Sequence, residues 1–200
     1  MAEWIFIKLS EVHRPSFTGL MALVCEVAVA GFILAALGFT LSCVATAMNA
    51  WKTMTTTVAV LSETTVVGLW YTCVDQGTQW ECKAYDTFLG VPSTLLAARC
   101  LLVLSDLLSF LGASVTFIGL RCIRLPCEIT SRTRGALTAC AGVLCSLAAA
   151  TTLVPVGAIT YQTVQEFWDP NLPDYMPRYE LGDAVFLGWG SGVSSYQDGP

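Results

Sequence analysis

Two cysteines in a polar stretch are the residues of this chain whose chemistry is most readily predicted. Cys73 and Cys82 stand in GLWYTCVDQGTQWEC, residues 68–82, with eight residues between them. Zinc binding or dithiol redox chemistry would need a closer CxxC pair or two further ligands, so the spacing favours a structural disulfide in an oxidising compartment. Closing so short a loop removes about 2.5 to 3 kcal/mol of unfolded-chain entropy.

The sequence shows no common motif for catalysis, nucleotide binding or metal binding. The single histidine is His13, and no HExxH, GxSxG, P-loop or GxGxxG pattern occurs, so we predict no enzyme, no cofactor and no metal site. The net charge is −5 and the cations form no long basic stripe, so nucleic acid is not an expected partner.

The composition indicates a membrane protein, since 54% of the residues are hydrophobic and 12% are charged. Three apolar runs match a hydrocarbon core of about 30 Å. They predict membrane helices over residues 21–47, 97–120 and 135–160; the second contains Asp106 and the third Pro155. We expect Asp106 to pair through water or with a hydroxyl of a neighbouring helix.

The orientation follows from residues 121–134, RCIRLPCEITSRTR, where four arginines oppose one glutamate. A short loop with this bias belongs on the cytoplasmic side. Residues 1–20 then form a cytoplasmic extension, while residues 48–96 and 161–182 face outside and expose Cys73 and Cys82 to oxidation. Cys122 and Cys127 fall on the reducing side, where S-palmitoylation and unmodified thiols are both compatible with the sequence.

The extracellular segment 48–96 has the composition of a small antiparallel sheet. Residues 51–85 are rich in β-branched and aromatic residues and predict three or four strands, with a turn at Gln76 and Gly77. Trp51, Trp70 and Tyr71 are expected either between this sheet and the bilayer surface or in the sheet core. The cysteines in or beside apolar runs are expected to pack as small apolar residues; they are Cys25, Cys43, Cys100, Cys140 and Cys145.

These features resemble the claudin family of tight-junction proteins over about residues 21–192. The residues that carry the resemblance are Trp51, Gly68, Leu69, Trp70, Cys73, Cys82, Tyr85 and Arg99, with Pro155 and YELGDAVFLGW at 179–189. It implies a left-handed four-helix membrane bundle with a small extracellular antiparallel β-sheet, in which Arg99 anchors the sheet. The apolar stretch within residues 183–200 is too short to span, so we expect an incomplete fourth helix and no scaffold binding through the usual C-terminal tail.

The resemblance also implies a function. Claudins associate with other claudins within one membrane and across the intercellular space, in adhesion that does not depend on calcium. Their strands seal the intercellular space or form ion-conducting pores. The implied selectivity residues are Lys83, Asp75 and Glu81. Whether they together favour cations or anions is left open. The implied adhesive residues of the second extracellular segment are Phe167, Trp168, Leu172, Tyr175 and Tyr179.

Two other functions are compatible with the sequence. An auxiliary or regulatory tetraspan of the same superfamily commonly carries an N-glycosylation sequon in its first loop, but Asn49 precedes Ala-Trp and Asn171 precedes Leu-Pro. An inactive, retained isoform is the second alternative, because an incomplete bundle exposes helix faces. The start of translation, at Met1 or Met21, is a related open choice.

Overall fold

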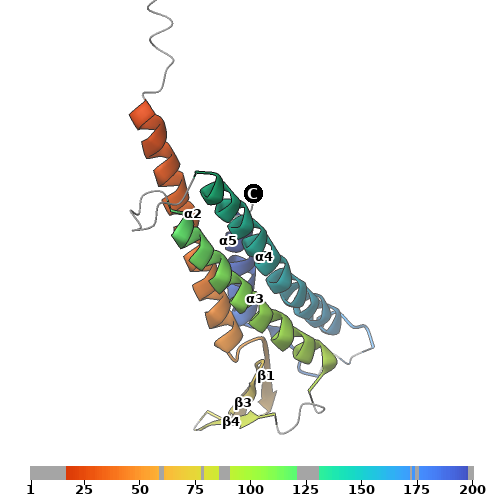
Figure 1. Cartoon of the computed structure of the whole chain (residues 1–200). Helices are drawn as coiled ribbons and strands as arrows, with labels where there is room; N and C mark the ends of the chain where they lie inside the picture. The colour runs from red at the N-terminus through yellow and green to blue at the C-terminus, as the bar shows by residue number, and fades with distance from the viewer. Residues whose placement is uncertain are drawn as a thin grey trace, which may run out of the picture.

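Four helices of the described part of the chain run alongside one another and carry a small sheet at one end (Figure 1). The computed structural model describes residues 17–58, 61–77, 79–85, 91–120, 131–171, 173 and 176–197. The helices are α2 (Phe17–Ala47), α3 (Ser93–Gly119), α4 (Ser131–Phe167) and α5 (Asp183–Gln197). Within the described residues, α2, α3 and α4 are long and apolar enough to cross a membrane. The predicted membrane bundle with its antiparallel sheet is therefore confirmed.

Helix α4 is longer than its apolar run. Its 37 residues extend for about 55 Å, against a hydrocarbon core of about 30 Å. It continues past Thr160 to Phe167, through residues that we assigned to the second extracellular segment. The buried Thr163 hydroxyl donates to the Ile159 carbonyl at 2.8 Å, so this polar residue sits in the helix without an unpaired group. The outer turns of α4 contact the sheet, which explains why the helix does not stop at the end of its apolar run.

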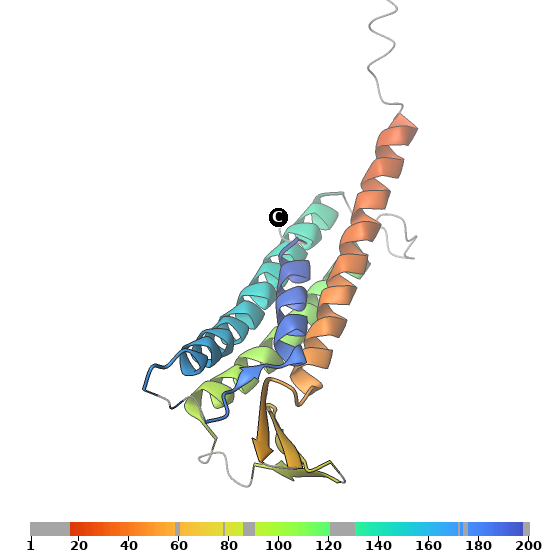
Figure 2. The same ribbon diagram turned by 180° about the vertical axis from the view of Figure 1, so that it is seen from behind.

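Helix α5 is short but extends beyond the apolar stretch that predicts it. Its 15 residues extend for about 22 Å, and it packs between α2 and α4 (Figure 2). The polar end remains helical because its hydroxyls have acceptors. Ser191 donates to the Gly38 carbonyl of α2 at 2.9 Å, and Ser194 donates to the Gly190 carbonyl at 2.9 Å.

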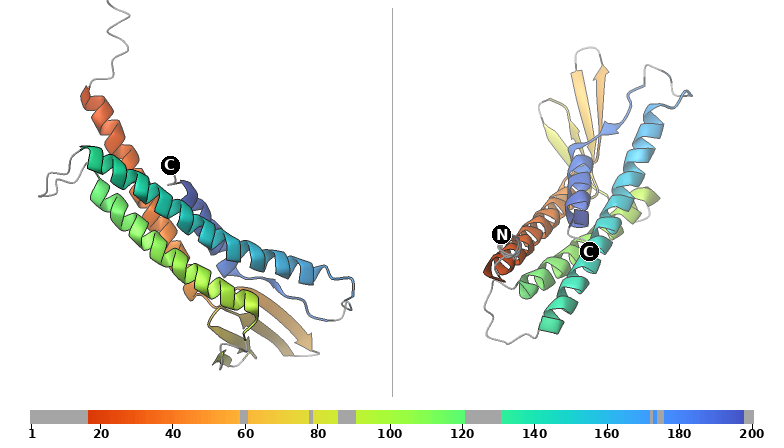
Figure 3. Two further views of the ribbon diagram at one scale, coloured as in Figure 1. Left: turned by 45° about the vertical axis from the view of Figure 1, so that its right-hand side comes forward. Right: turned by 90° about the horizontal axis from the view of Figure 1, so that it is seen from above.

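The sheet has five antiparallel strands in the order β4-β3-β2-β1-β5. Four come from the first extracellular segment, as predicted: β1 (Lys52–Val58), β2 (Leu61–Val67), β3 (Tyr71–Asp75) and β4 (Trp80–Ala84). The sequence did not predict the fifth, β5 (Glu180–Leu181), which pairs Leu181 with Lys52 at the other edge. The second extracellular segment thus joins the sheet just before α5 begins (Figure 3).

The main cluster of buried apolar side chains lies where the sheet meets the helix ends. It joins residues of all four helices to the chain around β1 and β2. Its members are Ala45, Trp51, Leu69, Val91, Leu95, Ala98, Leu102, Val156, Ile159, Ala184 and Val185. The sheet is therefore part of the same core as the bundle.

Two indole groups cap the end of α2 at this junction. The last carbonyls of a helix have no partner inside it. Trp51 Nε1 donates to the Ala45 carbonyl at 3.1 Å, and Trp70 Nε1 donates to the Thr46 carbonyl at 2.8 Å. Trp51 is fully buried, whereas Trp70 is partly exposed. Trp51 thus belongs to the shared core, and Trp70 lies at the rim of the junction.

Arg99 of α3 holds the turn between β2 and β3. Its Nε donates to the Leu69 carbonyl at 2.5 Å, and its guanidinium lies 5.3 Å from the Trp70 ring centre and 4.9 Å from the Tyr85 ring centre. The side chain is only 7% exposed. Attraction between a cation and ring faces is strongest where water is excluded. Two rings and one carbonyl therefore hold a buried charge at the base of the sheet.

We predict that Arg99→Lys lowers the free energy of unfolding by about 2 kcal/mol. Lysine keeps the charge but loses the planar group that stacks on two rings while donating from Nε. Thermal unfolding in detergent micelles should show a reduced Tm, with Arg132→Lys on the exposed first turn of α4 as the matched control. Equal Tm values for the two variants would contradict the anchoring role.

Candidate functional site

The predicted disulfide is present at the edge of the sheet. Cys73 of β3 and Cys82 of β4 face each other in the antiparallel register and are bonded. Gly77 in the connecting turn has a φ of 77°, a value that side-chain-bearing residues rarely adopt. The Gly77 amide donates to Asp75 Oδ1 at 2.9 Å. A cross-linked hairpin with a glycine turn is thus confirmed.

The glycine of GLW is required by a close approach of two backbone segments. A Cβ on Gly68 would lie 2.8 Å from the Asn49 carbonyl oxygen, in addition to other backbone atoms of Asn49. The Gly68 carbonyl also accepts a hydrogen bond from the Tyr85 hydroxyl at 3.2 Å. Gly68 therefore lets the turn that Arg99 holds lie directly against the link between α2 and β1. The residues on which the family resemblance rests meet at this junction: Trp51, Gly68, Leu69, Trp70, Tyr85 and Arg99.

The structure separates the predicted selectivity residues onto two faces. Side chains alternate across a strand, and directly paired residues share a face. Lys83 pairs with Thr72 and Glu81 pairs with Val74, so both lie on one face. Asp75 pairs with Trp80 and lies on the other face, with the disulfide. Because its carboxylate also accepts the Gly77 amide, the geometry gives Asp75 a role in the turn.

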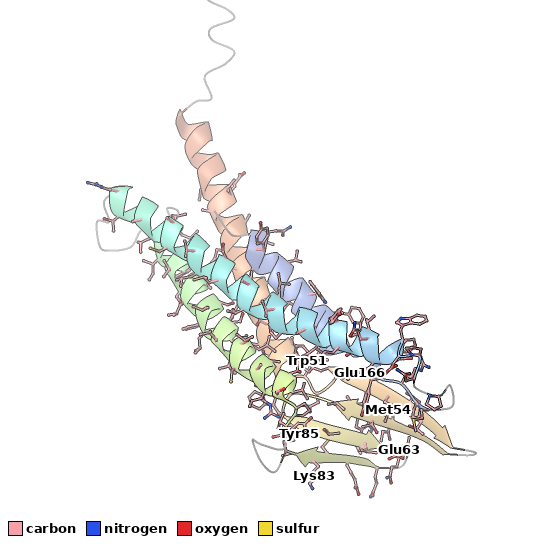
Figure 4. The ribbon with its side chains drawn as sticks, turned by 90° about the vertical axis from the view of Figure 1, so that its right-hand side faces the viewer. Trp51, Met54, Glu63, Lys83, Tyr85 and Glu166 are labelled. Atoms are coloured by element: carbon pink, nitrogen blue, oxygen red, sulfur yellow. A yellow bond between two sulfur atoms is a disulfide. The ribbon has the colours of Figure 1, made fainter. Side chains whose placement is uncertain are left out.

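The face that carries Lys83 holds two further charges that the register places there. One row across the sheet contains Lys83, Thr72, Val67 and Lys52. Glu63 of β2 is two positions from Thr65, which lies in the row of Glu81, so it shares this face. Figure 4 shows Lys83 at the edge of the sheet away from the helices. We name Lys83, Glu81 and Glu63 the charged face.

Lys52 is bound in an ion pair at the other end of this row. Its Nζ lies 3.0 Å from Glu166 Oε2 of α4 and 5.8 Å from the Tyr179 ring centre. The side chain of Lys52 is 14% exposed and that of Glu166 is 53% exposed. This pair ties β1 to the outer turns of α4. The sequence offered no local signal for it, because the two residues are far apart in the chain.

Three of the predicted adhesive residues, Phe167, Trp168 and Tyr179, line a groove beside β5. The Phe167 and Trp168 rings meet edge to face at 5.4 Å, and Arg178 donates to the Phe167 carbonyl. A groove of about 340 Å³ is lined by both rings and by Tyr179. Trp168 is 73% exposed, whereas Phe167 and Tyr179 are half-buried. Leu172 and Tyr175 lie outside the described residues.

The remaining cysteines do not all match our interpretation. Cys43, Cys100 and Cys140 are thiols on the membrane helices. Cys25 is disulfide-bonded, so our interpretation of it as a packing thiol is wrong. Hydropathy around a cysteine in a membrane helix does not reveal whether a second cysteine can reach it. The palmitoylation sites predicted at Cys122 and Cys127 lie outside the described residues.

The membrane carboxylate has a partner on a neighbouring helix. Asp106 Oδ1 of α3 accepts the Ser42 hydroxyl of α2 at 2.5 Å. A hydrogen bond of this kind joins helices where no water competes. Of the two partners that we expected, water or a hydroxyl, the structure has the hydroxyl. In the part of the chain that the structure describes, no group of three or more histidine, cysteine, aspartate or glutamate residues is placed to hold a metal ion.

Comparisons with known proteins agree with this geometry. The family model for the PMP-22/EMP/MP20/Claudin family matches residues 15–196. Claudin-3 of Canis lupus familiaris is 37% identical over 165 residues, covering 80% of this chain and 74% of the relative. Claudin-1 of Rattus norvegicus is 37% identical over 162 residues, with 80% and 76% covered. Claudin-9 of Homo sapiens is 36% identical over 163 residues, with 80% and 73% covered. This chain therefore belongs to the PMP-22/EMP/MP20/Claudin family, as a claudin-like tight-junction protein with several membrane-spanning helices.

Proposed function

We propose that this protein forms intercellular strands at the plasma membrane that set the paracellular barrier and its ion permeability. It associates with other claudins in the same membrane and with claudins of the opposing cell, in calcium-independent adhesion. Family membership supports this role. The observation that carries it is the disulfide-linked sheet, which shares one buried core with the bundle and carries Lys83, Glu81 and Glu63 on one face.

The charged face provides a physical basis for ion selectivity. In a narrow aqueous path, a fixed charge acts over about a Debye length, near 8 Å at physiological salt. The two side chains two positions apart on β4 are about 7 Å apart along the strand, so a passing ion experiences Lys83 and Glu81 together. Both are exposed. In this proposal the charged face lines the path and Lys83 opposes cations there.

The second extracellular segment provides the adhesive contact in this proposal. Trp168 presents most of its ring to solvent beside the groove at β5. Exposed tryptophan is the residue type that most often anchors a protein interface. The Lys52–Glu166 pair fixes this segment relative to the sheet. Adhesion and path lining thus depend on two neighbouring surfaces of one rigid unit.

Strand formation is the first test. The full chain, expressed in cells without claudins of their own, should concentrate at cell contacts and produce continuous strands in freeze-fracture images. Diffuse surface staining without strands would favour an auxiliary tetraspan. Retention in the endoplasmic reticulum would favour an inactive isoform. Either result contradicts the proposed function.

The charge of the path is tested by Lys83→Asp in an epithelial monolayer. Replacing a positive with a negative charge about 8 Å from an ion in water lowers a cation's energy by about 1 kcal/mol, before screening. We therefore expect the ratio of sodium to chloride permeability to rise about twofold to fivefold. The matched control is Ala84→Asp, which adds a carboxylate to the opposite face of the same strand. An unchanged ratio for Lys83→Asp, or equal effects of both variants, would exclude this face as the lining.

Adhesion is tested by Trp168→Ala in a cell-aggregation assay performed without calcium. Loss of a ring that anchors an interface costs about 2 kcal/mol or more, so aggregation should fall severalfold while surface expression stays constant. Trp80→Ala is the control, since Trp80 is 63% exposed on β4, at the far edge of the sheet from β5. If Trp80→Ala alone reduced aggregation, the sheet edge rather than the second segment would be the adhesive surface.

A further inference from the structure

The face of the sheet that holds Lys83 also holds Lys52. The register places Lys83, Thr72, Val67 and Lys52 in one row across four strands. Neighbouring strands lie about 4.8 Å apart, so the two lysines are about 14 Å apart at the ends of this row. An ion midway along the row is about 7 Å to the side of each lysine, which is within the Debye length of about 8 Å. Lys52 therefore adds to the charge of this face unless another group neutralises it.

Glu166 neutralises Lys52 from outside the sheet. Its Oε2 lies 3.0 Å from Lys52 Nζ. Figure 4 shows Glu166 at the end of α4 that meets the sheet. The side chain of Glu166 is 53% exposed, whereas that of Lys52 is 14% exposed. The acid thus lies at the water-exposed side of the pair, and the pair adds no net charge to the face.

Lys52 has two further contacts that do not depend on Glu166. Its Nζ lies 5.8 Å from the centre of the Tyr179 ring, and its backbone pairs with Leu181 of β5. The attraction between a cation and a ring face does not require an acid. Lys52 therefore stays at this corner of the face, as a cation without a counter-charge, when the carboxylate of Glu166 is removed.

The acid on α4 changes the net charge that this face presents. The charged face has two acids and one cation, so its net charge is −1. The bound pair of Lys52 and Glu166 leaves this charge unchanged. Lys52 without Glu166 brings the described charges of the face to zero. A residue outside the first extracellular segment thus decides whether these described charges are together negative or neutral.

We propose that Glu166 is a further determinant of ion selectivity, which acts by neutralising Lys52 at the β1 side of the ion path. This inference rests on the proposed function, since it requires the face that holds Lys83 to line the path. Glu166 makes the path more favourable for cations, and Lys52 without Glu166 makes it more favourable for anions. Both extracellular segments then set the charge of the path, although only the first one forms the charged face.

Two single substitutions test this role through the sign of their effects. Glu166→Gln leaves Lys52 without its counter-charge and should lower the ratio of sodium to chloride permeability in an epithelial monolayer. Lys52→Met leaves Glu166 unpaired and should raise this ratio. Each variant changes the charge by one unit, whereas Lys83→Asp changes it by two. We therefore expect changes of about 1.4-fold to 2.2-fold, the square root of the change expected for Lys83→Asp.

The double variant separates charge from structure. Lys52→Met combined with Glu166→Gln removes both charges and should restore the ratio of the unsubstituted protein, although the ion pair between β1 and α4 is lost. Ion pairs with an exposed partner contribute little to stability, so all three variants should reach the cell borders in equal amounts. Thr55→Lys is the matched control, because it adds one positive charge at an exposed position on the opposite face of β1. It should leave the ratio unchanged.

Three outcomes would overturn the inference. If the two single variants shift the ratio in the same direction, or the double variant does not restore it, the pair only positions the second extracellular segment. If Lys83→Asp changes the ratio but Glu166→Gln and Lys52→Met do not, the path excludes the β1 side of the face, and the proposed function stands without this inference. If none of these three variants changes the ratio, the face does not line the path, and the proposed path lining fails together with the inference.

Discussion

The sheet depends on a buried cation at its base. Arg99 lies between the Trp70 and Tyr85 rings and donates to the Leu69 carbonyl, at the level where helix ends meet the extracellular segment. A guanidinium removed from water is costly unless its neighbours replace the lost hydration. Here two ring faces and a backbone carbonyl replace part of it, and the buried Nη2 has no hydrogen-bond partner among the described residues. Each of the three partner residues is thereby constrained, which explains why the tryptophan, the tyrosine and the turn leading from β2 to β3 occur together.

The indole caps extend the same constraint to the first membrane helix. Trp51 and Trp70 donate to successive carbonyls of the last turn of α2, while Gly68 allows the turn to lie against the chain that follows it. Trp51 also contacts the chain just before α5, because its carbonyl accepts a hydrogen bond from the Gly182 amide at 3.1 Å. Helix α5 begins at the next residue. The first and last described helices are therefore joined through Trp51. The disulfide restrains the far hairpin, where β4 is exposed along its whole length and has little core of its own.

Local patterns in the sequence were sufficient for much of this architecture. Uncharged apolar runs predicted three membrane helices, and two cysteines around a glycine turn predicted the hairpin, because both depend on residues close together in the chain. The two-residue strand β5 and the ion pair between Lys52 and Glu166 were not predicted. Both exist only because the bundle brings segments together that are distant in sequence. The outer turns of α4 were assigned to a loop for the same reason, since contact with the sheet rather than hydropathy stabilises them.

The register changes how charge in the proposed ion path must be counted. From the sequence, Lys52 and Lys83 oppose Glu63, Asp75, Glu81 and Asp86 with no means of weighting them, and Asp86 lies outside the described residues. The structure pairs Lys52 with Glu166 and places Asp75 on the opposite face, where it accepts the Gly77 amide. Lys83, Glu81 and Glu63 are the charges of this group that share one face of the sheet. Lys83 and Glu81 lie about 7 Å apart along β4, which is less than the Debye length near 8 Å, so neither acts alone on an ion that passes. The sign of the electrostatic potential at the ion then depends on which of the two side chains lies at the narrowest point of the path, because the Coulomb energy falls with distance.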